Sequence, residues 1–335
     1  MKSLAIALLS LAALGCSGGG SSANGTAGGE AVLFEEEREA ARAPAASETV
    51  ERGEALLAGD DAPGAEVLFR RAIEENPRDA RANLDLGLAL EMQEDLPGAE
   101  AAYRAAVAID GEFAEALNNL GVLLRDTDRS EEALEVLARA VEVRPGLASA
   151  QLNYGLALEE TGQTEPAMEA YRRVLELAPN AATARIQLGL LQLGAGDSEG
   201  GLITLRRAVP AAEGSRALLS ALGNGLRRAG DAAMAVRVLT EAIEADEEPA
   251  PSPVVAELAL AQFAAEHREE AERTLTGLLA ERADYADGHY LLANMLAARQ
   301  AWREAARHYK AYLRLEPDGP QAEQARGRLR HVREQ

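Results

Sequence analysis

Small and large apolar residues recur along this chain with a period of 34 residues. A glycine opens the pattern in six successive segments. A small residue follows twelve positions later, a large apolar residue four positions after that, and usually an alanine three positions further on. The six glycines are Gly53, Gly87, Gly121, Gly155, Gly189 and Gly223.

Each segment is predicted to form two helices that fold back on each other. A turn such as 93–98 separates the glycine from the next small residue, and small residues allow two helices to cross closely. We therefore expect the glycine to face that small residue, and the large residue to fill the space between units. Pro77, Pro145 and Pro179 are expected to end second helices, because proline lacks an amide donor and clashes with the preceding turn.

The pattern divides most of the chain into units of equal length. Six units in phase occupy residues 46–249, and two weaker units at 252–285 and 286–319 follow the insertion Ala250-Pro251. The six in-phase units are 46–79, 80–113, 114–147, 148–181, 182–215 and 216–249. In the fifth unit Gly201 replaces the alanine and the second helix is expected to meet Pro210 early, and the segment 247–253 carries three prolines. We therefore expect the stack to bend or loosen around units five to seven. Residues 320–335 are predicted to form a capping helix.

This arrangement resembles the tetratricopeptide repeat, whose usual period is also 34 residues. The resemblance implies an all-α, right-handed superhelical solenoid of about eight helical hairpins plus the capping helix. It also implies a concave groove, formed by positions two, five, nine and twelve of each unit, that holds a protein or peptide partner. Carried over, these positions give Leu84, Leu88, Asn118, Val122, Arg125, Leu152, Leu156, Ile186, Leu190, Leu193, Ser220, Asn224, Arg227, Tyr290 and Asn294.

The predicted groove is mostly aliphatic in its middle. Such a surface suits an extended peptide or an amphipathic helix. It does not suit a carboxylate clamp, which needs lysine and arginine at the fifth and ninth positions. The alternative is that these side chains pack within the superhelix or against residues 30–43.

The N-terminus is predicted to be a targeting segment. The apolar stretch 4–14 is too short to span a bilayer, which takes about 20 residues. Residues 1–16 resemble a bacterial lipoprotein signal peptide: 1–15 would be removed, and Cys16, the only cysteine, would carry lipid. The resemblance implies a cell-envelope protein, and the absence of aspartate after Cys16 favours the outer membrane, facing the periplasm. Residues 16–29 are predicted to be the lipidated cysteine with a flexible Gly/Ser tether, and 30–45 a short acidic helix.

Composition agrees with a helical protein, because Ala, Leu, Glu and Arg are strong helix formers. The formal net charge of -21 argues against nucleic acid as a partner, since its binding needs a basic footprint. The end of the chain, 299–335, is nevertheless locally positive, with nine Arg and Lys against five Asp and Glu. A polar end cap explains this excess; an acidic partner or an anionic lipid headgroup is the alternative.

No motif for catalysis or metal binding stands out. His267, His289, His308 and His331 form no zinc motif, and we expect them to be surface or packing residues. There is no phosphate-binding loop. We therefore expect neither an enzyme nor a cofactor, a metal or a small-molecule substrate.

Two functions compete for such a scaffold. The first is a membrane-tethered adaptor that helps assemble an outer-membrane or pilus/secretion machine. Its plan is similar to that of the type IV pilus pilotins, although those usually have about six repeats. The second is a periplasmic chaperone or recruiter of peptidoglycan enzymes or proteases. A purely structural spacer is the third and plainest hypothesis.

Overall fold

The computed structural model describes residues 48–246 and 248–334 of the chain. The predicted signal peptide (1–15), Cys16 with its tether (16–29) and the acidic helix (30–45) lie outside these residues. They therefore stay predictions.

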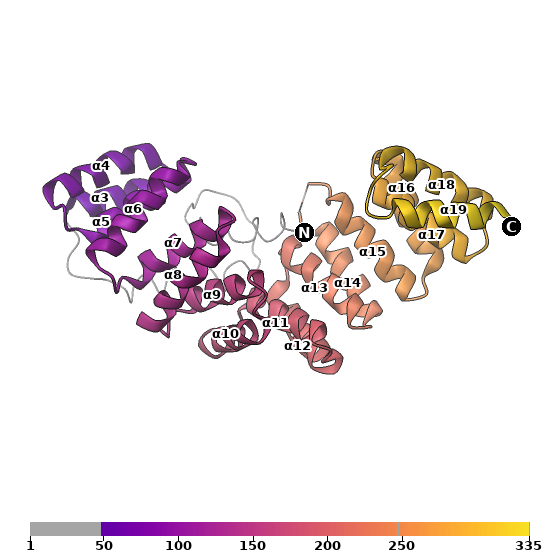
Figure 1. Ribbon diagram of the computed structural model, residues 1–335, viewed down its shortest axis with the longest axis horizontal. Helices are drawn as coiled ribbons and strands as arrows, with labels where there is room; N and C mark the ends of the chain where they lie inside the picture. Colours follow the sequence, from indigo (N-terminus) through magenta and orange to yellow (C-terminus); the bar gives the residue numbers. More distant parts are fainter. Residues whose placement is uncertain (1–47, 247, 335) are drawn as a thin grey trace. The chain divides into compact units, whose positions relative to one another are not determined.

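All regular structure in the described part of the chain is α-helical. Seventeen helices, α3 to α19, follow one another, and no strand occurs among the described residues (Figure 1). The prediction of an all-α chain of consecutive helical hairpins is confirmed. Within the same residues, no helix is long and apolar enough to cross a membrane.

The helices alternate between two roles, and we call the first helix of each hairpin the A helix and the second the B helix. From α5 onward, every A helix begins at the first residue of a unit placed from the sequence. The A helices are α3 Glu48–Ala58, α5 Ala80–Met92, α7 Ala114–Asp126, α9 Ala148–Glu160, α11 Ala182–Gly194, α13 Arg216–Arg228, α15 Ser252–Ala264 and α17 Ala286–Ala298. The B helices are α4 Ala62–Glu75, α6 Leu96–Ile109, α8 Ser130–Val143, α10 Thr164–Leu177, α12 Ser198–Ala212, α14 Ala232–Glu244, α16 Arg268–Glu281 and α18 Trp302–Leu315. The last helix is α19 Ala322–Glu334.

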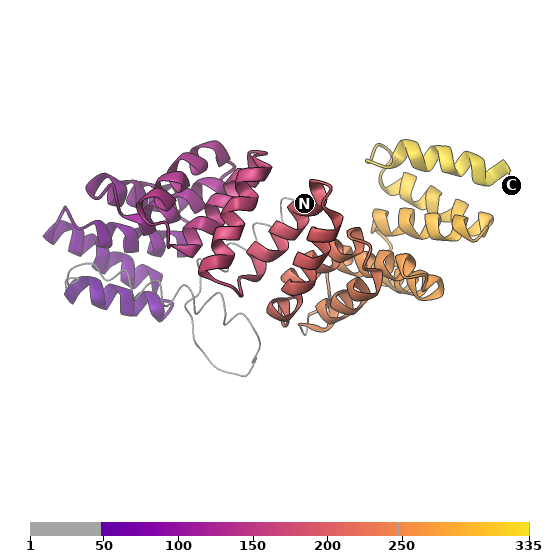
Figure 2. The same cartoon turned by 90° about the horizontal axis from the view of Figure 1, so that it is seen from below.

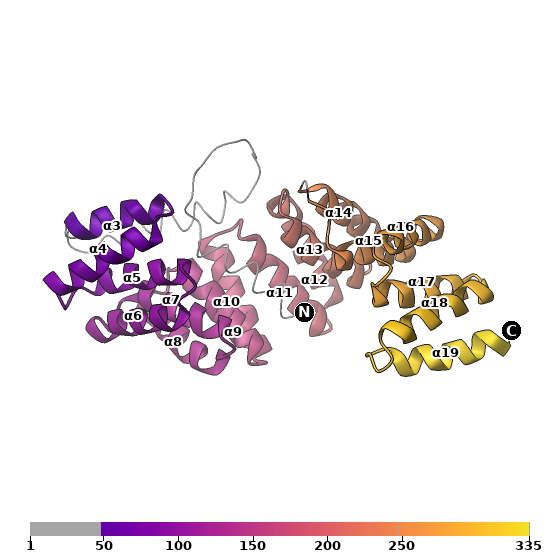
Figure 3. The ribbon, with the colours of Figure 1, turned by 90° about the horizontal axis from the view of Figure 1, so that it is seen from above.

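The chain divides into two compact units. The first ends at Leu191 and the second begins at Gln192, so the division falls inside α11. In the first unit the hairpins α3–α4, α5–α6, α7–α8 and α9–α10 pack in succession, as Figure 2 shows from below. In the second unit α13 to α19 pack in the same manner, and Figure 3 shows α17, α18 and α19 as consecutive layers.

The repeated glycine makes room for the large residue of its own hairpin. A Cβ added to Gly155 would lie 2.7 Å from Cε1 of Tyr171, and one added to Gly53 would lie 2.5 Å from Cε1 of Phe69. The rings of Phe69 and Tyr171 are fully buried. The glycine therefore faces the large residue of its own hairpin, and the expectation that it faces the small residue was wrong. In the last two repeats an alanine, Ala259 or Ala293, occupies the glycine position, with Leu275 or Tyr309 as the buried large residue.

A second repeated feature lies in the turn between the A and B helices. The fifteenth residue of all eight repeats has a positive φ, between 60° and 89°. L-residues other than glycine rarely adopt this conformation. Glycine occupies it in three repeats, whereas the other five hold a residue with a side chain. The eight residues are Asp60, Glu94, Asp128, Gly162, Gly196, Gly230, Glu266 and Gln300.

The insertion at Ala250-Pro251 does not separate the two repeats that flank it, because one arginine holds the connection in place. Arg216, the first residue of α13, donates hydrogen bonds from its guanidinium to the carbonyl oxygens of Ala242, Asp246 and Glu248. It also forms an ion pair of 3.2 Å with the carboxylate of Asp246. The chain divides earlier, in the fifth repeat.

Pro210 does not end its helix early, contrary to the expectation from the sequence. It lies in the last turn of α12, which continues to Ala212. The side chain of Pro210 is exposed, so its ring meets solvent rather than the core. Pro210 therefore does not shorten the B helix of the fifth repeat.

Candidate binding surface

The residues predicted for the groove lie on the A helices, but most of the apolar ones are not open. Leu84, Val122, Leu152, Leu156 and Ile186 are between 2% and 9% exposed. Leu84 belongs to one hydrophobic cluster of the first unit, and Leu152 and Leu156 belong to another. Packing within the stack, the alternative weighed from the sequence, therefore accounts for much of the aliphatic stripe.

Three of the predicted leucines remain half-buried: Leu88, Leu190 and Leu193. Leu88 packs with one side against the first cluster. Leu88 and Leu190 both stand at the ninth position of an A helix in the first unit. In the first unit, these are the two predicted apolar residues whose side chains are exposed enough to contact a ligand.

The predicted polar residues of the first unit form hydrogen bonds between neighbouring A helices. Asn153 of α9 donates from Nδ2 to Oδ1 of Asn118 in α7, at 2.8 Å. Arg125 of α7 donates from Nε to Oε1 of Glu160 in α9, at 2.9 Å. Ser130 of α8 donates to the other oxygen of Glu160, at 2.8 Å. Asn118 and Arg125 therefore connect successive repeats, whatever else they bind.

The predicted polar residues of the second unit are bonded in the same way. Arg227 of α13 donates to Glu257 of α15 at 3.0 Å, and Tyr290 of α17 donates to Gln324 of α19 at 2.9 Å. Oδ1 of Asn294 accepts hydrogen bonds from Tyr309 and from Arg328. Ser220 donates to the carbonyl oxygen of Arg216 in its own helix, and Asn224 is half-buried. No concentrated binding surface emerges in this unit.

A row of polar side chains that the sequence analysis missed lies beside these residues in the first unit. It consists of the sixth residue of four successive A helices, and we call it the polar ladder: Asp85, Asn119, Asn153 and Gln187. These residues are spaced by 34 in the sequence, so the repeat itself carried the signal. Position six is not among the groove positions that the resemblance implies, which are two, five, nine and twelve.

Three of the four residues of the polar ladder carry side-chain amides, whereas Asp85 is buried and paired with Arg81. A side-chain amide offers two N–H donors and an oxygen with two lone pairs. Asn153 uses one donor on Asn118, and its oxygen accepts no hydrogen bond from the described residues. Nearby, Nη1 of Arg125 is buried and has no hydrogen-bond partner within the described part of the chain. An unsatisfied buried donor is costly, but because this nitrogen is closed to solvent it is also closed to a ligand.

The first rung of the ladder is a buried charge cluster. Arg81 donates to Asp85 and to Glu54, each at 2.9 Å. Burial raises the pKa of Asp85 to about 7, although the Arg81 guanidinium opposes that shift. Further along the chain, buried tyrosines donate hydrogen bonds to glutamates: Tyr103 donates to Glu91 at 2.7 Å, and Tyr171 donates to Glu159 at 2.8 Å. Burial raises the pKa of both these glutamates above its usual range.

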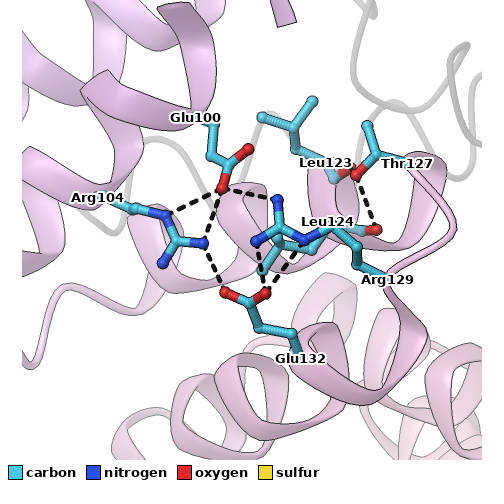
Figure 4. A network of polar contacts seen from close by, with 7 residues as sticks. All are labelled: Glu100, Arg104, Leu123, Leu124, Thr127, Arg129 and Glu132. Carbon is cyan, nitrogen blue, oxygen red and sulfur yellow. Dashed lines mark hydrogen bonds and ion pairs between the residues drawn. The ribbon is translucent and has the colours of Figure 1, made fainter. Parts of the chain in front are cut away.

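Outside the A helices, exposed charges pair with one another. Figure 4 shows Glu100 and Arg104 of α6 meeting Arg129 and Glu132 at the start of α8. Each arginine contacts both glutamates, with N–O distances of 2.5–2.8 Å. Hydrogen bonds from both arginines lower the pKa of Glu100 and of Glu132. The network is electrically balanced and joins two repeats, so it offers no free charge to a ligand.

The histidines show no catalytic or metal-binding arrangement in the described residues. Nδ1 of His289 and Nδ1 of His308 lie 2.9 Å apart, at hydrogen-bond distance. Burial lowers the pKa of His308, and the neighbouring His289 adds to that effect. Within the same residues, no three His, Cys, Asp or Glu side chains gather to hold a metal ion.

Known proteins share this repeat. The sequence model of the tetratricopeptide repeat matches residues 50–114, 152–216 and 256–320, which together exceed half of the chain. A second tetratricopeptide repeat model matches residues 112–180. No curated protein sequence matches the chain significantly.

Several solved structures have the same fold. The Cut9–Hcn1 hetero-tetramer structure matches 92% of this chain and 60% of that chain, with 15% identity and a TM-score of 0.56. PilF of Pseudomonas aeruginosa matches over 62% of this chain and 90% of its own, with 22% identity and a TM-score of 0.52. PilW, described as a widely conserved type IV pilus biogenesis factor, matches over 57% and 89%, with 20% identity and a TM-score of 0.51. At these identities the likeness shows the fold alone. The extent of the sequence match shows the family: this chain belongs to the tetratricopeptide repeat proteins, scaffolds for protein–protein interaction.

Proposed function

We propose that the first unit of this scaffold binds an extended peptide segment of a partner protein. The observation that carries the proposal is the polar ladder, with half-buried Leu88 and Leu190 at the ninth positions of α5 and α11, the first and last helices of the ladder. An extended peptide exposes main-chain N–H and C=O groups on both edges, and amide side chains can pair with either. Leucines beside such a row give the peptide's apolar side chains a place to pack.

The dimensions of the repeat suit such a ligand. Neighbouring packed helices lie about 8–10 Å apart. Three residues of an extended chain cover about the same distance, at roughly 3.3 Å per residue. One rung of the ladder therefore meets the main chain about once every three peptide residues.

Peptide selection followed by variant binding tests the proposal. A random peptide library is panned on the full chain, and the best peptide is measured by fluorescence anisotropy. Asn153→Ala removes a rung, and Leu88→Glu places a charge at a half-buried contact. Each is expected to weaken binding about tenfold, which corresponds to one lost hydrogen bond or apolar contact of about 1.4 kcal/mol. The matched control is Val67→Glu in α4, whose side chain is 66% exposed.

The control should leave the affinity unchanged. Equal affinities for the wild type, Asn153→Ala and Leu88→Glu would place the peptide elsewhere and overturn the proposal. Circular dichroism on every variant separates lost binding from lost folding. Leu156 is unsuitable for this test, because it is buried and a glutamate there would damage the core.

We further propose that the scaffold is tethered to the cell envelope through lipid on Cys16. The support is the lipoprotein-like segment 1–16 and the position of the only cysteine at its end. A bilayer anchor of this kind needs more than one acyl chain for stable attachment. Cys16→Ser should release the protein from the outer-membrane fraction after a salt wash. Retention of that variant in the membrane fraction would contradict lipidation.

Within the envelope, the adaptor role is the preferred hypothesis: the scaffold helps assemble an outer-membrane or pilus/secretion machine. PilW has this fold and is described as a pilus biogenesis factor, which supports the proposal without establishing it. The alternative is a periplasmic chaperone or a recruiter of peptidoglycan enzymes or proteases. Crosslinking in the native cell distinguishes them: an adaptor captures one machine component, whereas a chaperone captures many unrelated chains.

A further inference from the structure

One face of α18 carries a line of four cations. Arg303, Arg307, Lys310 and Arg314 are spaced by four, three and four residues, which places all four along one side of an α-helix. All four side chains are exposed, and none forms an ion pair within the described residues. We call these four residues the basic stripe.

The stripe is not neutralised from its own helix. The only acidic residue of α18 is Glu304, and its carboxylate already accepts a hydrogen bond from Arg299 at 3.2 Å. On the other side, α19 runs antiparallel to α18: Trp302 meets His331 near one end, and Tyr312 meets Gln321 at the other. Helix α19 has more arginines than carboxylates, four against two, and the exposed Arg330 is one of these arginines.

This arrangement has a cost for the folded protein. Like charges three or four residues apart destabilise a helix by about 0.2–0.5 kcal/mol per pair. The stripe contains three such neighbouring pairs in a chain whose net charge is -21. Carboxylates are thus plentiful, and elsewhere arginines are paired with them, as in the network around Arg104 and Arg129. The stripe stands out because its charges are left available.

The shape of the stripe selects the class of ligand. From Arg303 to Arg314 the helix advances eleven residues, which at a rise of 1.5 Å per residue is about 16 Å. An extended peptide of about five residues has the same length, and its alternate side chains lie about 6.6 Å apart. Neighbouring cations along the stripe lie about 4.5–6 Å apart along the helix axis. The guanidinium group of arginine can also form two parallel hydrogen bonds with one carboxylate.

A lipid surface fits the stripe less well. Binding to a membrane interface combines cations with apolar side chains that enter the lipid. Among the described residues, the exposed large apolar side chains are Val67, Leu96, Val143 and Ile203, none of them on α18 or α19. The stripe is also only one side chain wide, which matches a linear ligand rather than a plane.

We propose that the basic stripe of α18 is a docking surface for an acidic, extended protein segment with about five residues in contact. This surface lies on a B helix of the second unit and is independent of the peptide site proposed for the first unit. It gives the scaffold a second point of attachment for a partner, recognised by charge rather than by apolar contacts. Its binding should weaken with salt, because exposed charges are screened within about 8 Å at physiological ionic strength.

The experiment uses the full chain and a fluorescent oligoglutamate peptide, with an oligoglutamine peptide of equal length as the neutral probe. The test variant is Arg307→Glu with Lys310→Glu. The matched control is Arg228→Glu with Arg237→Glu, which changes net charge equally at two exposed arginines of α13 and α14. The test variant should weaken oligoglutamate binding at least about tenfold, since two attractive pairs become repulsive. The control should stay within about twofold of the wild type, because screening limits the effect of distant charges.

Three results would overturn the proposal. The first is equal binding by the wild type and the test variant. The second is an equal loss in test and control variants, which would indicate net charge alone. The third is stripe-dependent binding to phosphatidylglycerol vesicles without binding to the peptide, which would make the ligand a membrane. The variant Arg307→Gln with Lys310→Gln guards against misfolding and should give an intermediate loss.

Discussion

Substituting Gly155 by alanine tests the packing that closes each hairpin. Gly155 lies in α9, where Tyr171 of α10 packs against it. An added Cβ would lie 2.7 Å and 3.0 Å from two carbons of that ring and 3.3 Å from Cβ of Ala170. Favourable carbon contacts lie at about 3.5–4.0 Å, so the methyl group needs a shift of nearly 1 Å.

The ring has little freedom to move away. Tyr171 is fully buried, and its hydroxyl donates a 2.8 Å hydrogen bond to Glu159. Overpacking of a tight core costs about 1–3 kcal/mol. Against this, alanine gains about 1 kcal/mol over glycine inside a helix. The difference between those two effects is about 0–2 kcal/mol. Because the added Cβ would lie as close as 2.7 Å to a fixed ring, we expect Gly155→Ala to lower the free energy of unfolding by an amount in the upper half of that range.

The same substitution at Gly277 is the matched control. Gly277 is exposed in α16, and a Cβ there would meet nothing within 4 Å. Gly277→Ala should raise stability by about 0.5–1 kcal/mol through helix propensity alone. Urea denaturation followed by circular dichroism gives both midpoints. A Gly155→Ala protein as stable as the wild type, or shifted in the same direction as Gly277→Ala, would refute this account of the hairpin.

Three further predictions follow from single side chains. Because burial raises the folded-state pKa of Asp85 from 3.8 to about 7, folding takes up a proton between these values and stability falls as pH rises through that window. Asp85→Asn should remove this loss of stability at high pH. In urea titrations, the free energy of unfolding of Asp85→Asn minus that of the wild type should therefore rise from pH 5 to pH 8 by on the order of 2 kcal/mol. A difference that stays constant over this pH range would contradict the raised pKa of Asp85. Gln300→Gly should stabilise by about 1 kcal/mol and Gly162→Gln should destabilise by a similar amount in thermal melts, because both positions have a positive φ. Tyr171→Phe should cost about 1–3 kcal/mol by leaving the Glu159 carboxylate with only the long hydrogen bond from Gln187, and an unchanged midpoint would show that water replaces the hydroxyl.

The fold could be predicted from the sequence because its packing depends on residue size. A small residue opposite a large side chain is a steric requirement, met by glycine in the first six repeats and by Ala259 and Ala293 in the last two, so the repeated pattern indicates the phase of the hairpins. Even the weak repeats could be placed, and α15 and α17 begin at Ser252 and Ala286 as their frames indicate. The pattern does not specify which residue each small residue faces, and the expectation that the glycine faces the small residue of its hairpin was wrong.

The turn residues were harder to predict because their constraint is on the backbone. Five of the eight residues with positive φ carry side chains, so composition conceals the requirement. The signal was present in Gly162, Gly196 and Gly230, which are spaced by 34 residues. Strain at the other five positions is tolerated because the helices on both sides fix the turn.

The candidate site could be predicted only in part. The A-helix positions were placed on the right helices, but the burial of Leu84 or Ile186 depends on how closely neighbouring helices pack. Pairing between repeats, such as that of Arg125 with Glu160, likewise needs side-chain geometry. The polar ladder could have been found, since Asn119 and Asn153 recur at the repeat spacing.

Main-chain recognition by the polar ladder is the central claim, and N-methylation of a bound peptide tests it most directly. Each main-chain nitrogen of the selected peptide is methylated in turn, and affinities are measured for the wild type and for Asn153→Ala. The account predicts one position where methylation weakens wild-type binding about tenfold but leaves Asn153→Ala unaffected, because the methyl removes the donor that the Asn153 oxygen accepts. Equal losses in both proteins at every position would contradict recognition of the peptide main chain by Asn153.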